Sequence, residues 1–146
     1  MNARIKGWIY GLTLFLLALS GFAQMPIFKR YYIADIPGLG WLAQFYVTHS
    51  IHYIMASVLL ALGGFAVVDV LSKGKGLGVL TTSGWVKGGL LLGLVFSGAL
   101  MVVRNLPGVY FSHISIHVMN LVHLGFCMAL IAVSVGTLIT KRKWIQ

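Results

Sequence analysis

Five histidines are the residues of this sequence best suited to chemistry, and they fall into two groups. His49 and His52 stand near the start of one long apolar segment, and His113, His117 and His123 stand near the start of another. Ionisable side chains are rare in hydrocarbon unless they have a function. Neutral imidazole is the commonest protein ligand of transition metals and also binds haem iron. The two groups therefore predict a metal or haem site within apolar helices.

The composition places this chain in a membrane. Of its 146 residues, 59% are hydrophobic and 9% are charged, and the mean hydropathy is +0.93. Soluble globular domains lie far from these values. The single Cys127 excludes an internal disulfide and a CxxCH motif for covalent haem attachment. Two acidic residues leave no obvious carboxylate pair for glycosidase chemistry, and the scattered basic residues predict no nucleic acid partner.

Four apolar segments are long enough to cross a hydrocarbon layer of about 30 Å. We expect transmembrane helices at about residues 7–25, 41–71, 85–103 and 111–140. The predicted fold class is an all-α membrane protein, a four-helix transmembrane bundle that forms a single domain over residues 1–146 without an internal repeat. Small residues in the third segment, among them Gly93, Ser97 and Gly98, allow a helix or a flat ligand to approach closely.

The basic residues predict the orientation of these helices. With the N-terminus inside, the basic residues on the cytoplasmic side are Arg4, Lys6, Lys73, Lys75, Lys87, Lys141, Arg142 and Lys143. Only Lys29, Arg30 and Arg104 then lie outside. This positive-inside bias predicts that both termini are cytoplasmic and that both histidine groups lie toward the outer leaflet.

Counting along the helices predicts which histidines share a depth in the membrane. His52 precedes Asp69 by 17 residues, and His123 precedes Lys141 by 18. At a rise of about 1.5 Å per residue, the two imidazoles lie at nearly the same level. We therefore expect His52 and His123 to be the axial ligands of one haem iron inside the bundle.

The other three histidines, His49, His113 and His117, then form a shallower group. Such imidazoles can hydrogen-bond a quinone, take a proton from a quinol or support the haem propionates. A second haem is an alternative. His49 is only about 4.5 Å from His52 along the helix axis, which is too close to stack two macrocycles in one cleft.

The chain resembles the four-helix membrane cytochrome b subunits that anchor respiratory formate dehydrogenases and hydrogenases, and the related bacterial di-haem b-type cytochromes. Gly7-Trp8 followed by an apolar run ending in Ser20-Gly21 is similar to their first helix, in which a histidine precedes the tryptophan. His52 with Ala56 four residues later matches their second helix. The position corresponding to their late histidine in helix four is Thr137.

Because Gly7 and Thr137 replace one ligand pair of that family, the resemblance implies a reduced relative with one haem b near the outer leaflet, or two as the alternative. It implies a multi-pass subunit of a respiratory complex in the bacterial inner membrane, not catalytic alone. Electrons would pass between membrane quinone and a partner on the outer face, an iron-sulfur or multihaem cytochrome subunit. The alternative functions are a haem-free scaffold or assembly subunit and a small metal-handling membrane protein.

Overall fold

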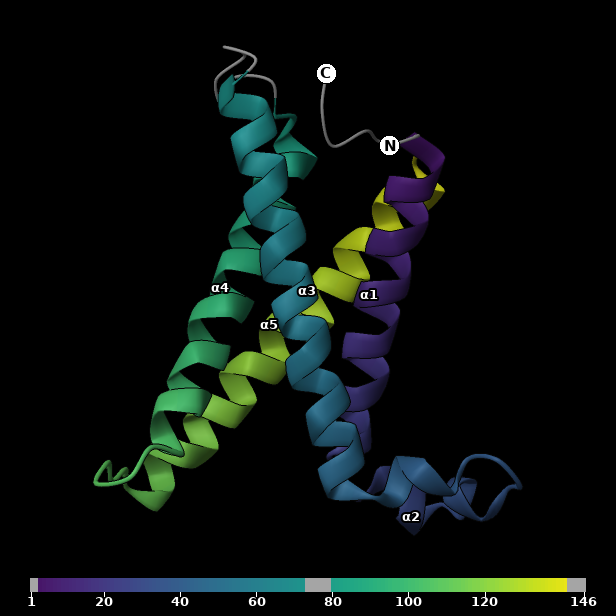
Figure 1. The fold of residues 1–146 in the computed structure, drawn as a ribbon, viewed down its shortest axis with the longest axis vertical. Coiled ribbons are helices and arrows are strands. Elements are labelled where there is room, and N and C mark those ends of the chain that lie inside the picture. Colours follow the sequence, from purple (N-terminus) through teal and green to yellow (C-terminus); the bar gives the residue numbers. More distant parts are fainter. Residues whose placement is uncertain (1–2, 73–79, 142–146) are drawn as a thin grey trace. The chain divides into compact units, whose positions relative to one another are not determined.

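The computed structural model describes residues 3–72 and 80–141, and helices account for most of them (Figure 1). In chain order the elements are α1 (Ala3–Ala23), α2 (Ile27–Arg30), the 3-10 helices η1 (Ile33–Asp35) and η2 (Gly40–Ala43), α3 (Phe45–Ser72), α4 (Thr82–Arg104) and α5 (His113–Ile139). Four of them, α1, α3, α4 and α5, are long and apolar enough to cross a membrane. The predicted all-α membrane class is confirmed.

The helix boundaries follow local backbone chemistry. The second long helix was expected from residue 41 but begins at Phe45, because η2 forms a separate turn and Gln44 after it has an extended backbone. The fourth was expected from residue 111 but begins at His113, after the Ser112 hydroxyl accepts a hydrogen bond from the Ser115 N–H at 3.2 Å. Residues 73–79, in the expected basic turn, lie outside the described residues.

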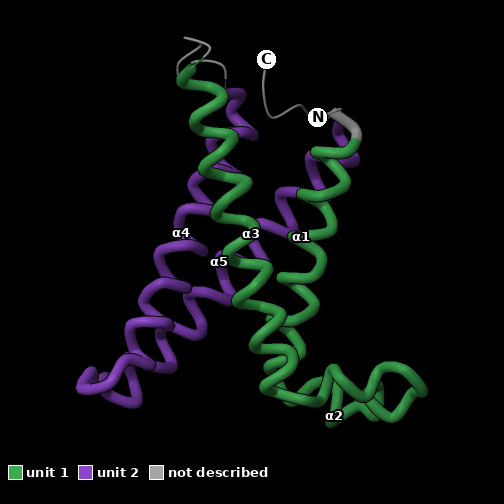
Figure 2. Tube along the Cα trace, viewed as in Figure 1, with its two compact units in different colours: residues 1–74 green, residues 75–146 purple. Residues whose placement is uncertain are grey.

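The chain divides into two compact units, residues 1–74 and residues 75–146 (Figure 2). In the first unit, α1 packs along α3 as a helical hairpin, and α2, η1 and η2 form the connection between them. In the second unit, α4 packs along α5 as another hairpin with a short connection. Each unit thus pairs one helix free of histidine with one that carries histidines.

Burial along the long helices is the reverse of that in a soluble protein. The hydroxyl residues Ser20 and Thr48 are 1% and 0% exposed, whereas the large apolar side chains Trp8 and Ile114 are 81% and 77% exposed. The buried hydroxyls donate to carbonyl groups of their own helix, as Ser20 does to Leu16 at 2.6 Å. Small polar residues between helices and large apolar residues outside are the arrangement that a lipid environment favours.

Gly93 of α4 marks a close approach within the second hairpin. A Cβ atom at this position would lie 2.7 Å from the ring of Phe126 on α5, whereas one at Gly88 would meet nothing within 4 Å. We expect Gly93→Ala to destabilise the hairpin by about 1–3 kcal/mol through overpacking. Gly88→Ala, the matched control, should be neutral or slightly stabilising. Thermal unfolding in detergent measures both, and equal stability of the two variants would contradict the close packing.

Candidate haem site

His52 of α3 is held at one ring nitrogen by two groups of α1. Its Nδ1 atom lies 3.1 Å from the carbonyl oxygen of Leu17 and 3.1 Å from the Oγ of Ser20. A carbonyl oxygen only accepts, so Nδ1 carries the proton and donates it. The neutral imidazole then has its lone pair on Nε2, the atom that can bind a metal. Histidine ligands of metals are typically oriented in this way by an acceptor at the other nitrogen.

Gly21 lets α1 approach the His52 ring. A Cβ atom built at Gly21 would lie 3.2 Å from Cε1 and 3.5 Å from Nδ1 of this imidazole. Side-chain atoms seldom come so close, so any larger residue would require the ring to shift. The pair Ser20-Gly21 therefore supplies both an acceptor for the imidazole and the space for it.

His123 of α5 is held in the same way by α4. Its Nδ1 atom lies 2.8 Å from the Oγ of Ser97. The Ser97 Oγ also lies 2.8 Å from the Gly93 carbonyl oxygen; when its proton is donated to that carbonyl, Ser97 accepts from the imidazole Nδ1–H. A Cβ atom at the next residue, Gly98, would lie 3.5 Å from the Cε1 atom of His123. The second unit thus reproduces the Ser-Gly pair and the orientation of the ring.

The similarity of the two hairpins extends along the first helix of each, α1 and α4. Aligned without a gap, residues 7–21 and 84–98 share the pattern Gly-Trp-x-x-Gly-x-x-Leu-x-x-Leu-x-x-Ser-Gly. In both hairpins a histidine of the following helix contacts the serine at the end of this pattern. The expectation of a chain without an internal repeat is therefore wrong. The second Gly-Trp, at Gly84-Trp85, was the signal in the sequence that could have revealed it.

His49, one turn before His52 on α3, has partners of its own in the first unit. Its Nδ1 atom lies 3.1 Å from the Oε1 of Gln24, just beyond the last residue of α1. Its ring stacks on Phe45, with ring centroids 5.1 Å apart, and forms a T-shaped pair with Tyr53, with centroids 4.4 Å apart. His49 is thus a partly buried, anchored imidazole.

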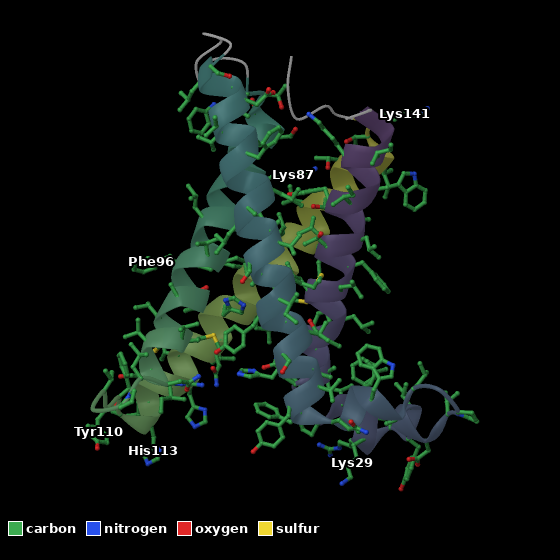
Figure 3. The ribbon with its side chains drawn as sticks, viewed as in Figure 1. Lys29, Lys87, Phe96, Tyr110, His113 and Lys141 are labelled. Carbon is green, nitrogen blue, oxygen red and sulfur yellow. The ribbon has the colours of Figure 1, made fainter. Side chains whose placement is uncertain are left out.

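His113 and His117 lie differently. Both are exposed in the first turns of α5, with His113 at the end of its hairpin (Figure 3). Among residues 3–72 and 80–141, neither ring makes a hydrogen bond. Within the second unit they are not brought to the Ser97-His123 pair. Of the three histidines predicted as a shallower group, His49 alone is hydrogen-bonded to a side chain outside its own helix.

The turn beyond the anchored histidine differs between the two hairpins. With His52 aligned on His123, the residue corresponding to His49 is Asn120, which accepts a long hydrogen bond from Arg104 Nη1 at 3.5 Å. The residue corresponding to Gln24 is Met101. The histidine with its Ser-Gly pair is therefore common to both hairpins, whereas the residues one turn away from it differ between them.

Each hairpin by itself supplies one histidine of the kind that can ligate a metal or a haem iron. In each hairpin the Nδ1 atom of the imidazole is held by the neighbouring helix, and a glycine of that helix lies beside the ring. The sequence had pointed to His52 and His123 and to the small residues around Ser97. It had not identified Ser20 and Ser97 as hydrogen-bond partners of the imidazoles, nor Gln24 as the partner of His49.

Comparison with known protein families, with curated proteins and with solved structures finds no match to this chain. Its function must therefore be argued from the two anchored histidines, the hairpins that hold them and the apolar surface around them.

Proposed function

We propose that this chain is a haem b-containing membrane subunit of a respiratory complex, which transfers electrons between membrane quinone and a redox partner on the outer face of a bacterial inner membrane. In this proposal His52 and His123 would hold the haem iron. The observation that carries the proposal is the repeated arrangement in which each hairpin holds the Nδ1 atom of one imidazole against a serine hydroxyl, beside a glycine.

The repeat also supports an equal depth of the two ligands. If each long helix crosses the membrane, α1 and α4 run in the same direction, because a single crossing, that of α3, lies between them. Ser20 lies 13 residues after Gly7, and Ser97 lies 13 residues after Gly84. Each serine is thus about 20 Å along its helix from an equivalent start. The two imidazoles held at these serines would then share a depth in the membrane.

The positive-inside bias gives the proposed orientation. Lys6 at the start of α1 and Lys141 after α5 lie on the cytoplasmic side, and Arg104 at the end of α4 lies outside. Both termini are then cytoplasmic, and His52 and His123 lie in the outer half of the membrane. The redox partner, an iron-sulfur or multihaem cytochrome subunit, would meet the outer connections of the two hairpins.

A single haem is favoured over two by the comparison of the hairpins. A second bis-histidine site built by the same repeat would need a ligand at each of the positions of His49 and Asn120. Asparagine is not an axial ligand of haem iron. The second hairpin therefore lacks the histidine that a second haem iron would need at this turn.

When bound, haem supplies reversible one-electron transfer, and the residues of this chain set its environment. The acceptors at Nδ1, namely Leu17 and Ser20 for His52 and Ser97 for His123, make each imidazole a more basic ligand. The apolar helices keep water away from the site, which tunes the reduction potential.

An optical spectrum of the purified full chain tests the proposal. We expect a reduced-minus-oxidised difference spectrum of the b type and one haem per chain by the pyridine haemochrome assay. The haem should be lost on denaturation, because Cys127 is the only cysteine and no CxxCH motif attaches haem covalently. Protein from haem-sufficient cells that shows no such spectrum would refute the assignment and favour a haem-free scaffold.

A further inference from the structure

A cavity of about 190 Å³ opens in the first unit where α1, α2, η2 and the start of α3 meet. Its walls are mostly apolar, with the ring of Phe45 on one side, and its polar side chains are those of Gln24 and Lys29 (Figure 3 labels Lys29). Sites for whole drug-sized ligands have volumes of about 300–1,000 Å³. This cavity can therefore take a ring-sized head group, with any tail lying outside it.

The amide of Gln24 has a defined direction in this wall. Its Nε2 atom lies 3.4 Å from the carbonyl oxygen of Ser20, so that atom is the NH₂ group, and its Oε1 atom faces Nδ1 of His49 at 3.1 Å. His49 therefore donates to Gln24 and holds the amide in place. Because Phe45 stacks on His49, two residues of the cavity wall are in direct contact with this imidazole.

We propose that this cavity binds the head group of a quinone, with the second N–H of the Gln24 amide donating to a quinone carbonyl and His49 acting as the positioning residue. The inference rests on the proposed function, because it names the place where that quinone binds. A neutral ring with two carbonyl groups needs one or two N–H donors and apolar walls, which this cavity has. A lipid phosphate favours several cations, and Lys29 is the only one in the cavity wall.

The comparison of the two hairpins supports a special role for this turn. The positions of Gln24 and His49 are occupied by Met101 and Asn120 in the second hairpin, while the Ser-Gly pair and the anchored histidine are the same in both. Haem ligation by two equivalent histidines requires only the shared residues. The Gln24-His49 pair is thus an addition to one half and adjoins a cavity of that half.

Direct binding of a short-chain quinone to the full chain in nanodiscs tests the proposal. Decylubiquinone and menadione serve as the benzoquinone and naphthoquinone probes, and quenching of tryptophan fluorescence is the readout. We expect Gln24→Met, which installs the residue of the second hairpin, to raise the Kd for at least one probe by about 5- to 10-fold. Met101→Leu, at the equivalent position of the other hairpin, should leave the Kd unchanged.

A double-mutant cycle tests whether His49 acts through Gln24. His49→Ala should weaken quinone binding about threefold or more in the wild-type chain, and His49→Gln should restore part of the affinity, because its amide can donate to Gln24 Oε1. In the Gln24→Met background, His49→Ala should add nothing. Additive effects would show that His49 does not position the amide.

The outcomes separate this inference from the proposed function. If the b-type haem spectrum is normal and Gln24→Met does not change the quinone affinities, the quinone site alone is overturned. If the haem spectrum is missing, the proposed function is refuted, and the binding titration still tests the quinone site. If phosphatidylglycerol in the nanodisc competes with the probes and Lys29→Gln has a larger effect than Gln24→Met, the cavity is a lipid phosphate site and the quinone assignment is overturned.

Discussion

Replacing either His52 or His123 by alanine should remove haem from the protein. Each substitution takes away one of two axial imidazoles, and alanine offers iron no ligand in its place. We expect the haem-to-chain ratio to fall from about one to near zero in both variants, measured by the pyridine haemochrome assay after purification. The effect should be equal for the two positions, because the repeat gives the two imidazoles the same role.

Two controls distinguish ligation from folding. His117→Ala, an exposed position on the same helix as His123, should retain the full haem content and spectrum. Imidazole added to His52→Ala or His123→Ala should restore a six-coordinate b-type spectrum, because the missing side chain leaves a cavity of its own shape. Full haem content in both alanine variants would move ligation to His49, His113 or His117.

The hydroxyl groups that hold the two imidazoles should tune haem affinity and potential. Ser97→Ala removes the acceptor 2.8 Å from Nδ1 of His123, and loss of such an outer partner typically costs about 10- to 100-fold in metal affinity. The reduction potential should rise, because a less basic imidazole stabilises the ferric state less. Ser20→Ala should have a smaller effect, since the Leu17 carbonyl still accepts from His52.

Thr137→Ala is the matched control for these serine variants. Its hydroxyl is also buried in the second unit and donates only within its own helix, to the Ser134 carbonyl at 2.9 Å. Removing it should leave both the haem affinity and the midpoint potential unchanged. A redox titration of the four proteins measures the potentials, and equal shifts in Ser97→Ala and Thr137→Ala would argue against a specific role of the serine.

The sequence alone determined the membrane class and the number of long helices. A segment in lipid must satisfy its backbone hydrogen bonds internally, so the length of each apolar run leaves little choice of structure. The residues at which the helices begin were harder to predict, because single residues decide them. The extended backbone of Gln44 makes α3 begin at Phe45, and the Ser112 cap sets the start of α5. The histidines stood out for the same physical reason, as polar groups in apolar helices.

The tertiary structure decided what each histidine does within its hairpin. Spacing along the sequence placed His49 and His52 about 4.5 Å apart along one helix axis, but it could not show that His52 meets the Leu17 carbonyl while His49 meets Gln24. Those contacts depend on the rotation and the axial register of two packed helices, which composition and periodicity leave undetermined. The repeat of Ser20-Gly21 in Ser97-Gly98 was present in the sequence, yet it acquired a chemical meaning only when both serines were found beside an imidazole.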